Sequence, residues 1–512
     1  MATSYLTPGV YVEEVDRGTK PIEGVGTAVA AFLGIAEKGP VGKATMIANW
    51  TQYVDVFGGF IPGAFLAHAV FGYFNNGGGL CYVVRIGGEE TEGVAAPQPV
   101  AEITAKGAAG TATIRALAKP NVNADGLTVE VTAGDDDSFT ISVKGFGGAE
   151  EKFEGLTLGK GAKNAFDVVN KQSTLVQLEE VKVAGLNLAE RAPAPGTYPL
   201  ALPAATTTAV VPVTPAQYQG DVTERSGIDG LEAVEEITMV LAPDIMAAYQ
   251  AGVLDMDGLK AVQLAMIAHC ERMGDRVAVI DTPPDLNAQQ VKEWRMNTAG
   301  YDSKYAAMYY PWVTVADATP NAKSTTITLP PSGHIAGIWA RNDNERGVHK
   351  APANEVIRGV ISLPINLTGA EQSVLNPNGV NCLRVFAGRG IRVWGARTLS
   401  SDPSWRYLNV RRLFNFVEKS IEGGTQWAVF EPNDSMLWAK MRRDIGAFLR
   451  VVWRSGALFG DTPEQAFFVK CDAENNPQDT RDLGQLIVDI GIAPVKPAEF
   501  VIFRISQYAP EA

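Results

Sequence analysis

A stretch near the N-terminus comes closest to a site that could do chemistry. Residues 39–45 read Gly-Pro-Val-Gly-Lys-Ala-Thr and share a Gly-Lys pair with the phosphate-binding loop of nucleotide hydrolases. That loop needs a glycine where Glu37 stands, because backbone N–H groups cradle the phosphates, and a Ser or Thr where Ala44 stands, because its hydroxyl binds magnesium. Neither requirement is met, so the stretch does not predict a nucleotide site.

Two other enzymatic patterns are incomplete. Residues 277–281 (Val-Ala-Val-Ile-Asp) look like the metal-binding strand of an ATPase, but without the phosphate loop they are more simply a strand that ends in a polar turn. Residues 24–26 (Gly-Val-Gly) continue in a way that breaks the dinucleotide-binding fingerprint and precede no clear helix. No Gly-x-Ser-x-Gly elbow and no His-Glu-x-x-His motif occurs in the chain.

The histidines, cysteines and clustered aspartates point to structure rather than to catalysis. No two histidines are spaced as a metal pair, and the four cysteines form no Cys-x-x-Cys pair, so we expect reduced, mostly buried thiols. A Ser–His–Asp triad is spatial and stays open, but four histidines without a nucleophile motif disfavour it. Residues 135–137 (Asp-Asp-Asp) could bind a cation, although a polar hairpin turn is the simpler reading. We therefore expect no catalytic residue, no metal and no cofactor.

Composition and charge narrow the possible classes of protein further. A chain of 512 residues is expected to form more than one domain, and 46% hydrophobic residues are ample for a core. The net charge of −13 argues against nucleic acid as the main partner, because phosphate binding needs a basic surface. The longest apolar run, about residues 25–36, is too short to cross a bilayer, and no signal peptide is expected. We expect synthesis and folding in the cytoplasm and no membrane insertion.

The elements that would position such residues alternate between strand and helix. Apolar runs at residues 27–35, 80–86, 238–242 and 277–280 predict buried strands, with helices expected at 50–57, 66–74, 254–273 and 288–297. We also expect an aromatic strand over 305–315 and a helix over 336–341. This order predicts a mixed α/β core built from discontinuous segments. The region around 93–222 is rich in Ala, Gly, Thr and Asp, with strands at 127–132 and 139–144 and a helix at 164–178, and predicts an inserted, mostly-β domain.

One long amphipathic helix is expected near the C-terminus, over residues 434–454. Asn433 or Asp434 can cap its start, since a short oxygen side chain satisfies free backbone N–H groups. Apolar residues at helical spacing make one face. Four basic residues fall together on the opposite face: Lys440, Arg443, Arg450 and Arg454. This face is either solvated or a docking surface for an acidic partner.

Both ends of the chain contain a short strand without a local partner. The first is formed by Val10, Tyr11, Val12, Glu13 and Glu14. The second is formed by Phe500, Val501, Ile502, Phe503, Arg504 and Ile505. A bare β-prone segment of this kind can add to a sheet edge of its own core or of a neighbouring subunit.

The second half of the chain contains a series of ordered strings. They include Tyr-Tyr-Pro-Trp-Val at 309–313, Val-Trp-Gly-Ala-Arg-Thr-Leu at 393–399, Tyr-Leu-Asn-Val-Arg-Arg-Leu at 407–413, Phe-Glu-Pro-Asn-Asp at 430–434 and Pro-Ala-Glu-Phe-Val at 497–501. In this order the strings resemble the contractile tail sheath family, which includes the sheaths of contractile phage tails, tailocins and extracellular or cytoplasmic contractile injection systems. Residues 8–14 and 76–85 resemble the same family. The resemblance covers roughly residues 5–90 and 225–508 and leaves out the inserted domain.

The resemblance implies a domain plan. We expect an N-terminal arm over 1–25, a core over 26–92 and 223–375, an inserted domain over 93–222, a tube-proximal C-terminal domain over 376–490 and a C-terminal arm over 491–512. The arms would pair with neighbouring subunits, and linkers around 18–26 and 491–497 would let the cores move. The implied partners are further copies of the chain, an inner tube protein, and baseplate and terminator or cap proteins.

The implied function is a structural one. Subunits would form a helical sheath around the tube, and the sheath would contract from a metastable extended lattice without nucleotide, as part of a phage tail or injection particle. We hypothesise that Lys440, Arg443, Arg450 and Arg454 face the tube. The rival interpretations are an α/β enzyme such as a divergent nucleotide hydrolase, and a tube or baseplate component of the same machine.

Overall fold

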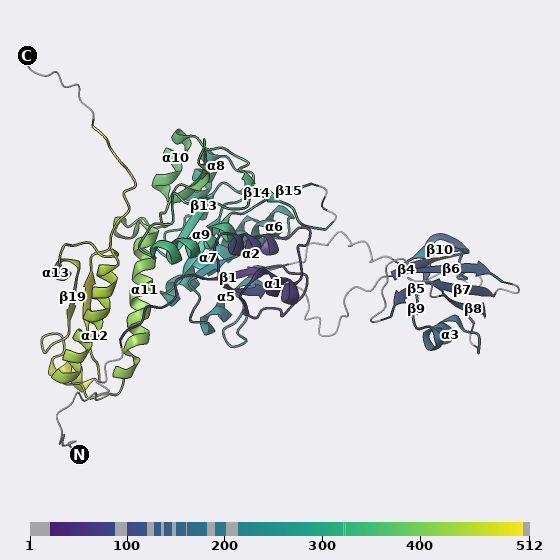
Figure 1. The fold of residues 1–512 in the computed structure, drawn as a ribbon, viewed down its shortest axis with the longest axis horizontal. Coiled ribbons are helices and arrows are strands. Elements are labelled where there is room, and N and C mark those ends of the chain that lie inside the picture. Colours follow the sequence, from purple (N-terminus) through teal and green to yellow (C-terminus); the bar gives the residue numbers. More distant parts are fainter. Residues whose placement is uncertain are drawn as a thin grey trace, which may run out of the picture. The chain divides into compact units, whose positions relative to one another are not determined.

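The computed structural model describes residues 21–87, 100–119, 127–134, 138–145, 150–159, 161–181, 190–200, 213–320, 322 and 324–504. They fall into two compact units, one of which is Thr91–Ala209 and the other the rest of the chain (Figure 1). The predicted N-terminal strand at 10–14, Ile505 and the aspartates at 135–137 lie outside the described residues.

The larger unit is built on an eight-stranded sheet with the order β18-β17-β13-β12-β11-β1-β3-β2. Its strands are β1 (Val29–Gly34), β2 (Thr45–Ile47), β3 (Leu80–Arg85), β11 (Met239–Leu241), β12 (Val277–Asp281), β13 (Ala306–Tyr310), β17 (Val380–Phe386) and β18 (Gly390–Val393). The six inner strands are parallel, and β2 and β18 add antiparallel edges. The inner strands are almost entirely apolar and buried, as in a sheet covered on both faces.

Helices connect these strands and cover the sheet. They are α1 (Trp50–Phe57), α2 (Leu66–Asn75), α4 (Pro215–Gln219), α5 (Gly227–Gly230), α6 (Asp244–Gln250), α7 (Met256–Met273), α8 (Ala288–Glu293), α9 (Ser332–Arg346) and α10 (Gly369–Leu375). The crossovers β1–α2–β3 and β11–α7–β12 run in opposite directions along the sheet, so right-handed connections place α2 and α7 on opposite faces. This confirms the predicted α/β core.

Helices α2 and α9 pack unusually close together. A Cβ atom added at Gly333 would lie 2.4 Å from the carbonyl oxygen of Ala69, and one added at Gly337 would lie 2.4 Å from that of Tyr73. Only glycine fits at both positions, one turn apart on α9, so the two glycines set the distance between the helices.

Several expected elements differ in detail. The single strand expected over 305–315 is two strands in different sheets, because β14 (Val313–Ala316) leaves the main sheet to pair with β15 (Thr326–Leu329) and β16 (Val360–Ser362). The helix expected over 164–178 ends at Gln172, and a strand follows it. The helix expected over 336–341 is longer at both ends, and the one expected over 288–297 becomes a π-helix (Trp294–Ala299) after Glu293.

The smaller unit is mostly β, as predicted, with its own hydrophobic core. One antiparallel sheet has the order β10-β6-β7-β8 and the other β4-β5-β9, and α3 packs against β8 and β9. The elements are β4 (Val100–Ala105), β5 (Ala108–Ala118), β6 (Thr128–Ala133), β7 (Phe139–Lys144), β8 (Glu150–Leu156), α3 (Ala165–Gln172), β9 (Val176–Glu180) and β10 (Gly196–Pro199).

The C-terminal part of the larger unit has a separate hydrophobic cluster between two long helices and a two-stranded sheet. Its elements are α11 (Leu408–Thr425), α12 (Ser435–Arg454), α13 (Pro463–Ala466), β19 (Phe467–Lys470), α14 (Gln478–Asp482) and β20 (Asp489–Ile492). The domain boundary that we expected at residues 375/376 separates β13 from β17 of the same eight-stranded sheet, so the central fold continues to at least Val393.

Candidate assembly surfaces

The carboxyl edge of the parallel sheet is where doubly wound proteins bind ligands, at the point where the strand order reverses. Here that point lies between β1 and β11, and the carboxylate of Asp244 fills it. Asp244 accepts hydrogen bonds from the backbone N–H of Ile35 (2.6 Å), of Phe65 and of Leu66 (3.2 Å). It therefore occupies the N-terminus of α2, which is the position that a phosphate group would take.

A second buried carboxylate lies at the end of β12. Asp281 accepts hydrogen bonds from the backbone N–H (3.1 Å) and the hydroxyl (2.6 Å) of Ser332, at the start of α9. Burial raises the pKa of Asp281 to about 7, and burial likewise raises the pKa of Asp244 to about 7. The strand that looked like an ATPase metal site thus ends in a helix cap.

The remaining candidates for chemistry are packed inside the protein. All four cysteines are free and buried, and burial lowers the pKa of both His269 and His334 to about 4. Among the residues that the structure describes, no three His, Cys, Asp or Glu side chains gather as a metal site, and no helix is long and apolar enough to cross a membrane.

A buried ion pair joins the C-terminal domain to the central sheet. Arg412 on α11 makes two hydrogen bonds to the carboxylate of Asp343 on α9, at 2.9 and 2.5 Å. Arg412 also donates to the carbonyl oxygen of Thr27, and the Thr27 hydroxyl donates to Asp343. The neighbouring Arg411 is buried as well, with its guanidinium over the rings of Tyr305 and Trp405.

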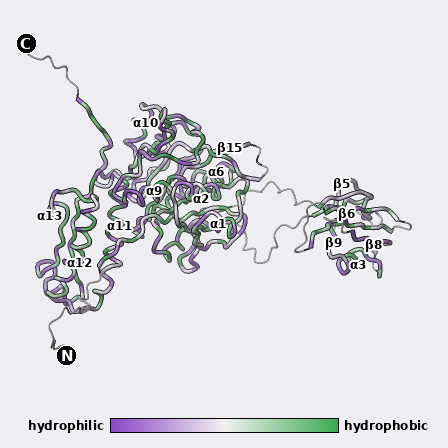
Figure 2. Tube along the Cα trace, viewed as in Figure 1, coloured by the Kyte–Doolittle hydropathy of each residue, from purple (hydrophilic) through white to green (hydrophobic). Residues whose placement is uncertain are grey.

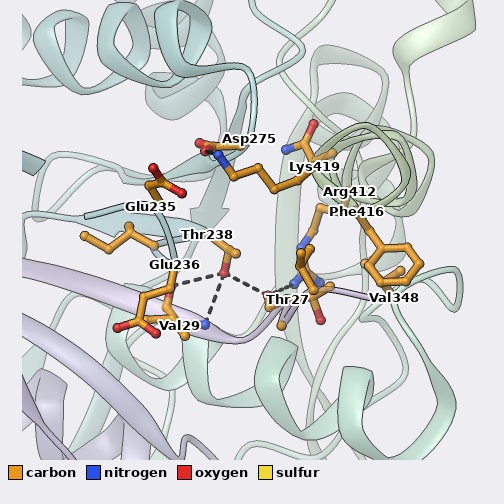
Figure 3. Close-up of a pocket in the computed structure, with 14 residues that line it drawn as sticks. Thr27, Val29, Glu235, Glu236, Thr238, Asp275, Val348, Arg412, Phe416 and Lys419 are labelled. Carbon is orange, nitrogen blue, oxygen red and sulfur yellow. Dashed lines mark hydrogen bonds and ion pairs between the residues drawn. The ribbon is translucent and has the colours of Figure 1, made fainter. Parts of the chain in front are cut away.

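A cavity of about 280 Å³ lies beside this junction, between residues 25–29, residues 235–238 and α11 (Figure 3). The hydroxyl of Thr238 bonds to the backbone of Thr27 and Val29 across its floor. Lys419 reaches Asp275 at 3.5 Å across one side. These contacts of Thr238 and Lys419 hold together the segments that line the cavity. No charged residue on its walls is arranged as a nucleophile with a base.

The segment before β1 is docked along α11. Ile22 belongs to the C-terminal hydrophobic cluster, and the backbone N–H of Val25 donates to the hydroxyl of Ser420 at 3.1 Å. Gly424 makes room for this segment, since a Cβ atom there would lie 2.7 Å from Ile22. The linker that we expected to be flexible around residues 18–26 is therefore held in place over its described part.

The four basic residues predicted to face a partner all lie on α12. Arg443, Arg450 and Arg454 are exposed, whereas Lys440 is half-buried over the ring of Trp427. Arg443 pairs with Asp444 on its own helix at 2.9 Å. Asp434 caps the helix through the N–H groups of Met436 and Leu437, and the apolar face packs on β19. The structure thus brings the basic residues together on one face, with exposed Met436 and Val451 among them.

The described part of the predicted C-terminal strand makes no strand in the single chain. Phe500, Val501, Ile502, Phe503 and Arg504 are exposed, with Phe503 83% exposed. Figure 2 shows this hydrophobic stretch at the end of the described chain. Four apolar side chains in water are costly to leave uncovered, which is expected of a segment that pairs with another surface.

Sequence reasoning missed the residues that hold the base of this segment. Glu499 bonds to Arg397, Asn376 and Tyr407, which are 92–123 residues away in the sequence. One signal was present: Glu499 is the single acidic residue in an otherwise apolar stretch that starts at Ala498. A charge in such a stretch needs a partner, but spacing alone does not say which.

Comparisons with known proteins agree with this architecture. The phage tail sheath protein central domain matches residues 225–399 and the phage tail sheath C-terminal domain matches residues 400–507. The tail sheath protein of Burkholderia phage BcepMu is 24% identical over 98% of this chain and 97% of its own length. The tail sheath protein of Vibrio phage KVP40 is 30% identical over 36% of this chain, and the match covers only 27% of the length of that relative.

Solved structures extend the likeness to the whole chain. The helical sheath of the anti-feeding prophage in its contracted state contains a chain with a TM-score of 0.59 and 26% identity, covering 98% of this chain and 100% of that one. A chain in the baseplate structure of the same particle has a TM-score of 0.58 and 26% identity, covering 99% and 100%. The fold and these matches together define a structural protein of a contractile particle. The chain belongs to the contractile tail sheath family.

The buried acid at the end of β12 predicts a pH-dependent stability. Its pKa is about 7 in the folded chain and 3.8 in an unfolded one, so the folded state keeps a proton that the unfolded state loses. The stabilisation that protonated Asp281 gives to the folded state is complete below pH 3.8 and is lost as the pH rises through 7. The unfolding free energy of the wild type should therefore fall between pH 5 and pH 7. Asp281→Asn should reduce the slope of this fall by up to about 1.4 kcal/mol per pH unit.

Urea unfolding at several pH values measures this slope. Asp55→Asn, at an exposed position of α1, is the matched control and should leave the wild-type slope unchanged. Equal slopes for Asp281→Asn and wild type would contradict the assignment.

Two adjacent glycines of α11 test the docking of the N-terminal segment. Gly424→Ala should displace Ile22 and raise hydrogen–deuterium exchange over residues 21–26, because the new methyl group overlaps the Ile22 side chain. Gly423→Ala is the control, since nothing lies within 4 Å of its added Cβ atom. It should stabilise the helix by about 0.5–1 kcal/mol and leave exchange of the segment unchanged. Equal hydrogen–deuterium exchange over residues 21–26 in the two variants would show that this segment is not docked on α11.

Proposed function

We propose that this chain polymerises into the helical sheath of a contractile particle, surrounds an inner tube and contracts to drive the tube through a target envelope. Family membership carries the proposal. Two observations support it. The apolar side chains of residues 500–503 are exposed, and the edge of the main sheet where a ligand would bind is filled by the carboxylates of Asp244 and Asp281. Energy would be stored in a metastable extended lattice, without nucleotide and without an enzymatic step.

The terminal arms would link subunits by strand addition. The exposed residues 500–504 are the donor. The acceptor is the two-stranded sheet β19–β20, whose outer edges form no ladder with another strand in the described residues, and which is marginal in water without further strands. Each added backbone hydrogen bond contributes about 0.5–1.5 kcal/mol, a modest sum per arm that grows when repeated around a closed lattice. The N-terminal residues 10–14 would pair in the same way.

The basic face of α12 would meet the inner tube. Three exposed arginines in a chain with a net charge of −13 are suited to an acidic partner surface. Baseplate, terminator and cap proteins are the further partners, and assembly would take place in the cytoplasm of the producing bacterium. Negative-stain microscopy of the purified protein tests the whole proposal: striated cylinders support a sheath, whereas rings, short tubes or monomers with hydrolase activity would overturn it.

Removal of the C-terminal arm should abolish assembly. A chain that ends at Phe500 keeps Glu499 and its partners but loses the donor strand, so it should stay monomeric in sedimentation at concentrations where the full chain forms cylinders. A chain that ends at Gln507 is the control and should assemble. Cylinders from the shorter chain would refute strand addition by this arm.

Charge reversal on α12 should weaken assembly on tubes. Arg450→Glu with Arg454→Glu replaces attraction by repulsion toward an acidic tube, so several-fold more tube should be needed in a co-sedimentation assay, and the defect should grow at low salt. Lys38→Glu with Lys43→Glu changes the charge equally at exposed positions of the central domain and should have no effect. If the two double variants behave alike, α12 does not face the tube.

A further inference from the structure

Four hydrogen bonds hold the carboxylate of Glu499, directly before the exposed arm. One oxygen accepts from the Asn376 amide (2.6 Å) and from Nε of Arg397 (3.0 Å). The other accepts from Nη2 of Arg397 (2.7 Å) and from the Tyr407 hydroxyl (3.0 Å). Glu499 is 19% and Arg397 10% exposed at the side chain. A two-bonded Arg–carboxylate pair in such a partly buried site is among the stronger polar contacts in proteins.

Arg397 is itself fixed to the central sheet. Its backbone N–H donates to the Asn381 side chain (2.7 Å) and its carbonyl accepts from the same side chain (2.8 Å), and Asn381 lies in β17. Its third guanidinium nitrogen donates to the carbonyl oxygen of Asn376. Burial opposes ionisation of Glu499, but the hydrogen bonds from Arg397, Asn376 and Tyr407 prevail and lower its pKa. Glu499 therefore stays ionised at neutral pH, and its bonds to Arg397 tie the arm to the main sheet.

The chain changes abruptly at Glu499. Before it, the N–H of Val495 donates to Ala457, and the carbonyl oxygen of Val495 accepts from Asn409 on α11. After it, residues 500–504 are exposed and form no hydrogen bond with any other residue that the structure describes. The linker expected to be flexible over 491–497 is thus bonded to the C-terminal domain, through Ala457 and through Asn409 on α11, and the exposed arm starts at residue 500.

We propose that Glu499 and Arg397 form an anchor that fixes the base of the C-terminal arm to the central domain and so sets the length of the tether between neighbouring subunits. The proposal rests on the proposed sheath function. At about 3.4 Å per residue, the eight residues 500–507 span at most about 27 Å. Without the anchor the tether would start after Val495, and the twelve residues 496–507 would span at most about 41 Å.

The anchor therefore limits where an acceptor sheet can lie, and it concentrates the donor strand near that sheet. Effective concentration falls roughly as the −3/2 power of tether length, so lengthening from eight to twelve residues lowers it about twofold per contact. A longer tether also makes it easier for an arm to pair with the wrong neighbouring subunit. Glu499 is a positioning residue in this scheme, because it makes no contact in the described chain with the exposed strand that would pair.

The first test uses the monomeric full-length chain and hydrogen–deuterium exchange. Glu499→Gln keeps the shape but loses the charge, and Tyr407→Phe loses one of the four hydrogen bonds. Exchange over residues 496–499 should rise several-fold in Glu499→Gln and less in Tyr407→Phe, with the rest of the chain unchanged. Glu154→Gln, which removes an exposed ion pair with Lys152 in the smaller unit, is the matched control and should show no change at 496–499. Unchanged exchange in Glu499→Gln would overturn the anchor.

The second test measures assembly. The concentration at which cylinders first appear should rise about twofold or more in Glu499→Gln, while Glu154→Gln should match the wild type. A variant with higher exchange but an unchanged assembly concentration would overturn the tether role. Failure of the wild type to form cylinders would instead count against the sheath function, and the exchange experiment would still decide whether the anchor exists.

Discussion

The buried ion pair between Arg412 and Asp343 is the contact on which the larger unit depends. It brings together α11 of the C-terminal domain, α9 of the central fold and Thr27 of the N-terminal segment. Both charges are almost free of solvent, so the loss of one partner would leave the other unpaired, at a cost of about 3–5 kcal/mol. That is a large part of the 5–15 kcal/mol by which a domain is typically stable. The pair therefore holds the sheet, the helical layer and the start of the chain in one fixed relation.

The bases of both arms are tied to this same frame. Ile22 and Val25 lie on α11, and Glu499 is bonded to Arg397 beside the main sheet. Motion between subunits would then have to occur in the short stretches beyond these contacts and not within the subunit. Such a subunit would move as a rigid body, and the lattice would change by rotation and sliding about tethers of fixed length.

Local patterns predicted much of the fold, because the inner strands and long helices carry continuous or periodic apolar runs. Helix α1 and strand β7 match their expected bounds, and the cap by Asp434 was one of two candidates. The sequence could not show contacts between distant residues. Arg411 and Arg412 look like a solvated pair on an amphipathic helix, yet both are buried against aromatic rings and an acid from other elements. Nor could it show that both linkers are docked, since the glycines and prolines that they contain are equally typical of free chain.

The inserted unit has a consequence for how such a protein can change over time. Its buried residues, from Ala101 to Leu200, form a core that shares no member with the main core, and the sheet is complete without it. In the proposed sheath, substitutions in the main unit would also be constrained by neighbouring subunits, whereas the core of the inserted unit depends only on its own residues. The inserted unit could thus diversify, or be replaced by a foreign domain, without disturbing the core of the main unit.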